Sequence, residues 1–195
     1  MNIDLPLWKN ASSKRKRIYS ALFIFIIAML VTVVGVLVPL SPQEEKLVND
    51  QVNQTLIQGT ANNNLAPSIF LNNFLLCLAM FIPLAGLPIG LFIMFSSGQA
   101  FRAIFDIVTS SGVSSATSQN ISASTASFVL ILITLTFFFE YVSYSIGMTE
   151  SIWLFRRLTQ HRWRELKTTL ILIGIVAVLL TLGAIVETWA VSIPL

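Results

Sequence analysis

The sequence predicts an all-α membrane protein: a single-domain polytopic helix bundle over residues 1–195, with about five transmembrane helices. Hydrophobic residues make up 55% of the chain and charged residues only 11%, whereas typical soluble domains carry about 25% charged residues. No Asp, Glu, Lys or Arg lies between Asp106 and Glu140. Several apolar runs reach the ~20 residues that one helix needs to cross a bilayer. The expected spans are residues 18–40, 68–85, 88–108, 128–155 and 168–191.

The first expected span, residues 18–40, follows four consecutive basic residues at positions 14–17. A basic start followed by an apolar run can be a signal peptide, but this run is longer than the roughly 7–15 residues of such a segment, and no small-residue cleavage site follows it. We therefore expect a retained span. Basic residues favour the cytoplasmic side, so the amino terminus should be cytoplasmic.

A helix-start signal follows the first span. Ser41 stands three residues before Glu44, with Pro42 between them at the first helical position, which is the pattern of a capping box. Apolar residues then recur at helical spacing, so a short amphipathic helix is expected over residues 42–57, on the outer face. Such a helix either covers the mouth of the bundle and lies in the interface, or docks a partner.

The apolar stretch at residues 68–108 is about twice as long as one span. Its middle holds Pro83, Gly86, Pro88 and Gly90, and an interior proline removes a backbone donor and clashes with the preceding turn. We expect a break there. The halves would reach about 27 and 31 Å, which favours a two-span hairpin over a re-entrant loop, and both remain possible. The Ser/Thr/Ala-rich segment 109–127 is expected to be an exposed outer loop.

The last two spans are joined by a second basic segment, residues 156–167. Basic loops are retained in the cytoplasm, so this loop should share a side with the amino terminus, and the carboxyl terminus should lie outside. The expected location is the cell membrane. The net charge of +3 is explained by this bias, and we expect no nucleic-acid partner.

Polar side chains within the spans are the candidate functional residues, because charges in lipid are expensive and by default mark function or buried pairing. These residues are expected either to pair with one another and fix helix register, or to line a proton or solute path. The candidates are Asn72, Asn73, Arg102, Asp106, Glu140, Tyr144 and Glu187.

Glu140 is expected to be the deepest carboxylate, facing the bundle interior near the broken helices. Tyr144 is one turn further on the same face, where its hydroxyl could reach the carboxylate. Arg102 should pair with Asp106, one turn beyond it. An outer polar layer of Asn73, Arg102 and Glu187 is also geometrically possible.

The sequence carries no enzyme motif: no G-x-S-x-G elbow, no H-E-x-x-H, no phosphate-binding glycine loop and no Cys/His cluster. The single cysteine, Cys77, allows no intrachain disulfide and has no His or second Cys nearby. We therefore expect a non-enzymatic protein without catalytic residues, cofactor or metal.

The arrangement of these features resembles the stage II sporulation protein M family of bacterial and archaeal membrane proteins. The matching features are the Asn72-Asn73 pair, the glycines at 86, 90 and 98, Glu140, and the closing segment LGAIVE at residues 182–187. The resemblance implies a five-span, non-enzymatic membrane protein. The sporulation member looks like a scaffold that holds cell-wall-remodelling partners during engulfment.

Two functions are therefore expected. The first is a membrane scaffold or accessory subunit, embedded in the lipid bilayer and bound to other membrane proteins or to further copies of itself. The alternative is a small transporter or channel, in which Glu140 and Glu187 line an ion or solute path.

Overall fold

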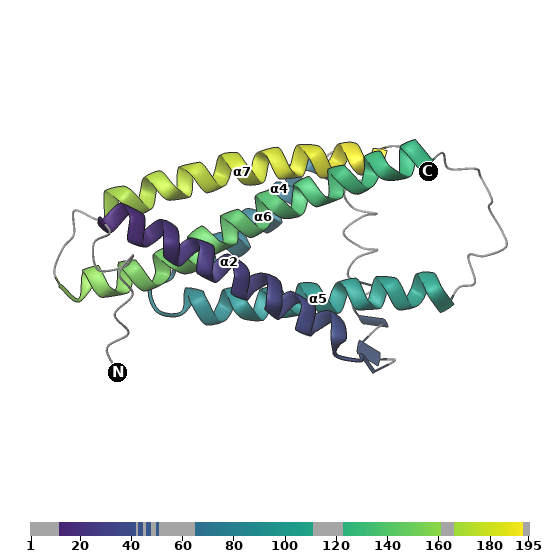
Figure 1. The fold of residues 1–195 in the computed structure, drawn as a ribbon, viewed down its shortest axis with the longest axis horizontal. Coiled ribbons are helices and arrows are strands. Elements are labelled where there is room, and N and C mark those ends of the chain that lie inside the picture. Colours follow the sequence, from purple (N-terminus) through teal and green to yellow (C-terminus); the bar gives the residue numbers. More distant parts are fainter. Residues whose placement is uncertain are drawn as a thin grey trace.

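The computed structural model describes residues 12–41, 43–44, 46–47, 50, 65–110, 123–160 and 166–192. Its main elements are five helices (Figure 1), and the described residues contain no strand. The helices are α2 (Ser13–Leu37), α4 (Leu65–Met80), α5 (Gly86–Ser110), α6 (Ala123–Leu158) and α7 (Leu166–Ser192). The expectation of an all-α protein is confirmed.

Three of the helices are long and apolar enough to cross a membrane. The qualifying segments are Lys14–Leu37, Ile131–Leu158 and Leu166–Ala190, and α4 is apolar but shorter. Many large apolar side chains on these segments point outward, among them Phe23 (64% exposed) and Leu170 (67%). Water would penalise such a surface, whereas lipid would not.

The basic ends of the helices gather at one end of the bundle. The start of α2, the end of α6 and the start of α7 all lie at the left in Figure 1. We call this the basic end; its described cations are Lys14, Arg15, Lys16, Arg17, Arg156, Arg157 and Lys167. The end of α5, the start of α6 and the end of α7 lie at the opposite end. Both basic segments of the sequence therefore share one side of the fold.

Helices α2 and α5 cross at small residues. A Cβ atom at Gly35 would collide with the carbonyl oxygen of Phe95, and one at Gly98 would collide with the carbonyl oxygen of Thr32. Close backbone approach of this kind is typical of membrane helix pairs. Beside the crossing, the Tyr141 hydroxyl of α6 donates a hydrogen bond to the Thr32 hydroxyl at 2.8 Å. A third helix is thereby fixed to the pair.

The break between α4 and α5 is a turn at residues 81–85. Pro83 lies in this turn, and Leu84 takes a positive φ of 67°. Pro88 and Gly90 belong to α5, so the expected break at 83–90 is too long. Pro88 is tolerated because the first turn of a helix has no intrahelical partners for its N–H groups.

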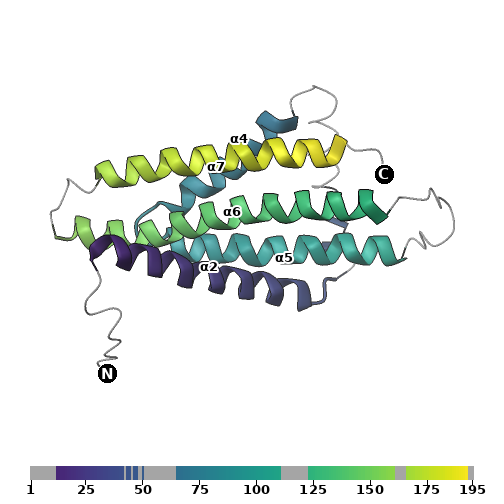
Figure 2. The same ribbon diagram turned by 45° about the horizontal axis from the view of Figure 1, so that its top comes forward.

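Ser151 of α6 holds the turn in place. Its hydroxyl donates to the carbonyl of Ile82 at 2.8 Å, and its own carbonyl accepts from the N–H of Leu84 at 3.5 Å. Backbone groups that a turn frees inside a membrane protein need such partners. Figure 2 shows α4 running obliquely across α7, while the other four helices lie side by side.

Two sequence expectations outside the spans have different outcomes. The capping box is confirmed: the Ser41 backbone N–H and hydroxyl both donate to the Glu44 carboxylate, at 2.9 and 2.7 Å. The described residues between 43 and 50 are helical, and the rest of the expected helix lies outside the described residues. The expected loop at 109–127 is partly wrong, because α6 already begins at Ala123; residues 111–122 are not described.

Candidate functional site

The centre of the candidate site is Glu140 on α6. The Asn73 amide of α4 donates a hydrogen bond to Glu140 Oε1 at 2.6 Å. The neighbouring Asn72 is exposed, and its side-chain Nδ2 donates to the side-chain oxygen Oδ1 of Asn73 at 3.5 Å. A carboxylate far along an apolar helix is thus held by a neutral donor from another helix, the short helix α4.

Glu187 and Tyr144 complete this group. The Glu187 carboxylate on α7 is close enough to interact electrostatically with Glu140, and Tyr144 is within range of both carboxylates. Tyr144 is only 4% exposed. Within the described part of the chain, no hydrogen bond links its hydroxyl to Glu140, so that expected contact does not form. We call these four residues, Asn73, Glu140, Tyr144 and Glu187, the Glu140 cluster.

Arg102 and Asp106 pair with each other on α5. Arg102 Nε donates to Asp106 Oδ2 at 2.6 Å within α5, and both side chains are about a third exposed, at 36% and 30%. The expected pair is therefore present. The possible outer layer of Asn73, Arg102 and Glu187 stays a prediction: α4, which carries Asn73, packs against both α5 and α7.

Sequence reasoning missed a second carboxylate, Glu150, near the basic end of α6. It is the most buried described charge, with 2% of its side chain exposed, and Arg17 Nη1 lies 3.8 Å from Glu150 Oε2. The Thr169 hydroxyl donates to Oε1 at 2.8 Å. The available signal was that an acidic residue inside an apolar run stood near the side on which the basic residues gather.

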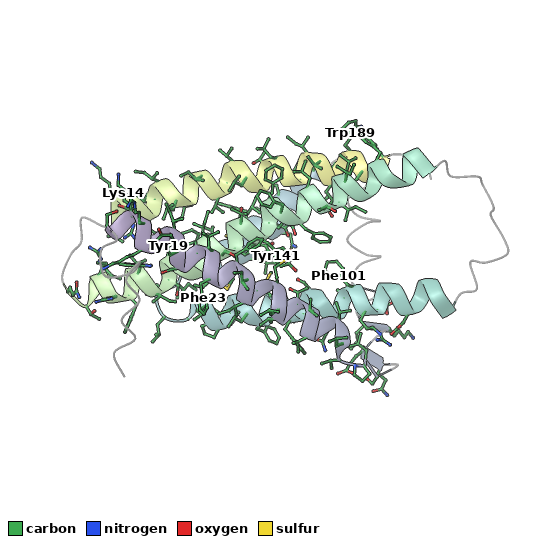
Figure 3. All side chains as sticks on the ribbon, viewed as in Figure 1. Lys14, Tyr19, Phe23, Phe101, Tyr141 and Trp189 are labelled. Carbon is green, nitrogen blue, oxygen red and sulfur yellow. The ribbon has the colours of Figure 1, made fainter. Side chains whose placement is uncertain are left out.

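Two tryptophans stand near opposite ends of the bundle. The guanidinium groups of Arg17 and Arg157 each lie 5.6 Å from the centre of the Trp153 ring, a distance at which a cation is attracted to the ring face. At the other end, labelled in Figure 3, Trp189 packs edge-to-face on Phe128, with ring centroids 5.5 Å apart. Tryptophan is enriched at both membrane interfaces, so these positions mark two candidate interface levels.

The side chains of the Glu140 cluster can form hydrogen bonds or exchange a proton. The described residues contain no cluster of three or more His, Cys, Asp or Glu that could hold a metal ion. Cys77 is buried against α6, where its thiol lies 3.5 Å from the Ser143 carbonyl oxygen. No protein family, curated protein or solved structure matches this chain in the comparisons.

Proposed function

We propose that this chain is a non-enzymatic, multi-pass membrane protein that acts as a scaffold or accessory subunit of a membrane complex. The observation that carries the proposal is the hydrogen bond from Asn73 to Glu140. It joins two helices through a neutral amide, which suits a polar lock that fixes helix register. The resemblance to the stage II sporulation protein M family supports the same function.

The proposed topology has five spans, with α4 and α5 forming a two-span hairpin and the basic end in the cytoplasm. Support comes from the antiparallel course of the two helices and from the gathering of the basic segments at one end. The carboxyl terminus would then lie outside.

Labelling of single cysteines tests this topology. The sites are Ser12, Ser115, Gln160 and Pro194, in a background in which Cys77 is replaced by Ser. In intact cells an impermeant maleimide should label the cysteines at 115 and 194, while those at 12 and 160 should react only after lysis. Labelling of both 115 and 160 in intact cells would refute the proposed topology.

The alternative function is a small transporter or channel. It is favoured by one observation: the packed helices α6 and α7 each carry a carboxylate, Glu140 and Glu187, within electrostatic range of the other. Like charges placed together inside a membrane are costly unless a proton or cation joins them. The Glu140 cluster would then be a binding site on an ion or proton path.

Two substitutions at Glu140 separate the functions. Glu140→Gln keeps the shape and an acceptor for Asn73 but removes the charge, whereas Glu140→Leu removes both. A scaffold should keep its co-purifying partners with Gln and lose them with Leu. The measurement is recovery of partners after purification in mild detergent, beside proton or cation flux in liposomes that hold the pure protein. Flux through the wild type that disappears in Glu140→Gln would contradict the scaffold and support the transporter.

A further inference from the structure

A cavity of about 350 Å³ opens between α2, α6 and α7 at the basic end. This volume lies within the roughly 300–1,000 Å³ range of ligand pockets. Its apolar wall is formed by Ile18 and Ala21 of α2, Ile146 of α6 and Leu172 of α7. Ile18 is 58% exposed, so the wall continues onto the surface that the proposed membrane would cover. An aliphatic chain is the ligand that fits such a wall.

One polar side chain in the wall lacks a partner. Thr149 lines the cavity and is only 4% exposed, and its hydroxyl makes no hydrogen bond within the described part of the structure. Its neighbours in the α6 wall are apolar or already bonded. A buried hydroxyl without a partner costs roughly 1–3 kcal/mol. The hydroxyl oxygen itself is covered, so the wall at Thr149 presents only apolar atoms to a ligand, which again suits an aliphatic chain.

Cations stand at the mouth of the cavity. Lys14 and Arg17 both line it, and Figure 3 shows Lys14 at the extreme end of α2. The one acidic residue of the lining, Glu150, has Arg17 at 3.8 Å and the Thr169 hydroxyl at 2.8 Å, so its charge is already compensated. The remaining field at the mouth is positive. It therefore favours an anionic group next to the aliphatic part of the ligand.

We propose that this cavity binds an anionic phospholipid. One acyl chain lies against Ile18, Ala21 and Leu172, and the headgroup phosphate lies at Lys14 at the mouth of the cavity. The inference rests on the membrane location in the proposed function but not on the choice between scaffold and transporter.

Quenching of Trp153 by brominated lipids tests the site. The protein carries Phe in place of Trp8, Trp163 and Trp189, and it is reconstituted alone in vesicles that contain brominated phosphatidylglycerol or brominated phosphatidylcholine. Half-maximal quenching should need about fivefold less of the anionic lipid, the factor expected from one basic contact at the membrane surface. Trp153 is a suitable reporter because its ring centre lies 5.6 Å from the Arg17 guanidinium.

Matched variants test whether the preference for the anionic lipid depends on the cavity. Lys14→Gln should abolish most of the preference, whereas Lys46→Gln, which removes the same charge outside the basic end, should retain it. Ala21→Leu fills the cavity and should weaken quenching by both lipids. Its control is Gly174→Leu on α7, where an added Cβ meets open space. Gel filtration verifies that each variant is folded. If Ala21→Leu is not folded, the comparison of Lys14→Gln with Lys46→Gln decides the question.

Three results would overturn the proposal: equal quenching by the two lipids, equal effects of Lys14→Gln and Lys46→Gln, or full competition by soluble glycerol phosphate. The last would indicate a free phosphate ester as the ligand in place of a lipid. Because the purified chain is measured without partners or flux, failure of the scaffold proposal leaves this test unaffected.

Discussion

Glu140 and Glu150 lie on the same helix, about 15 Å apart along its axis, and are stabilised in different ways. Glu140 is bound by the neutral Asn73 amide, whereas Glu150 is paired with the Arg17 cation and the Thr169 hydroxyl. A cation near a helix end can extend its charge toward water, but one at mid-span cannot do so cheaply. Distance from the basic end therefore accounts for the different partners of these two carboxylates.

The largest effect should follow removal of Glu150. Glu150→Leu should destabilise the protein by about 2–3 kcal/mol, because the largely buried Arg17 guanidinium loses its contact with the carboxylate; this is the low end of the roughly 2–5 kcal/mol range for such truncations. The low end applies because the Arg17 side chain is 16% exposed and can turn toward water. Unfolding by sodium dodecyl sulfate in detergent measures the loss. The double change Arg17→Met with Glu150→Leu should recover most of it, and a double variant as unstable as the single one would contradict the ion pair's role.

The hydrogen bond between Asn73 and Glu140 should contribute less to stability than the Arg17–Glu150 ion pair. A double-mutant cycle with Asn73→Leu and Glu140→Leu should give a coupling energy of about 0.6–1.7 kcal/mol, from the average to the largest value for hydrogen bonds between membrane helices. The same unfolding assay measures it. The control is a cycle with Asn72→Leu and Glu140→Leu, whose coupling should be smaller because the exposed Asn72 side chain bonds to Asn73 and not to Glu140. Coupling above that of the Arg17–Glu150 pair would reverse the order of the two sites.

The smallest effect concerns a third glutamate, Glu44, which is fully exposed. Hydrogen bonds from the Ser41 side chain and then from its backbone N–H lower the pKa of Glu44 below its ordinary value of 4.5. Since the folded pKa is the lower one, the cap stabilises the helix start above about pH 4.5 and is lost as the pH falls through the folded pKa. A carboxyl-carbon NMR titration measures this, and Ser41→Ala should raise the pKa toward 4.5. An unchanged pKa in that variant would exclude the cap as the cause.

Features that depend on neighbours along the chain were predictable from the sequence. The capping box at Ser41 and the Arg102–Asp106 pair are local, and both are present. The long apolar helices follow from composition alone. The Arg17–Glu150 and Asn73–Glu140 contacts join residues far apart in the chain, so they depend on which face each helix turns toward its neighbours. The hydrophobic pattern of a lipid-exposed helix specifies that rotation weakly, because apolar residues suit both lipid and core.

The bonds between Ser151 and the 81–85 turn have a consequence for synthesis of the protein. The turn leaves the ribosome well before α6, so the groups that Ser151 bonds, the Ile82 carbonyl and the Leu84 N–H, are without that partner when the hairpin first forms. Until α6 arrives, these groups need water or the insertion machinery to satisfy them. In the proposed topology, the α4–α5 hairpin would therefore take its final depth late, and a ribosome stalled before residue 151 would carry a hairpin held nearer the aqueous surface.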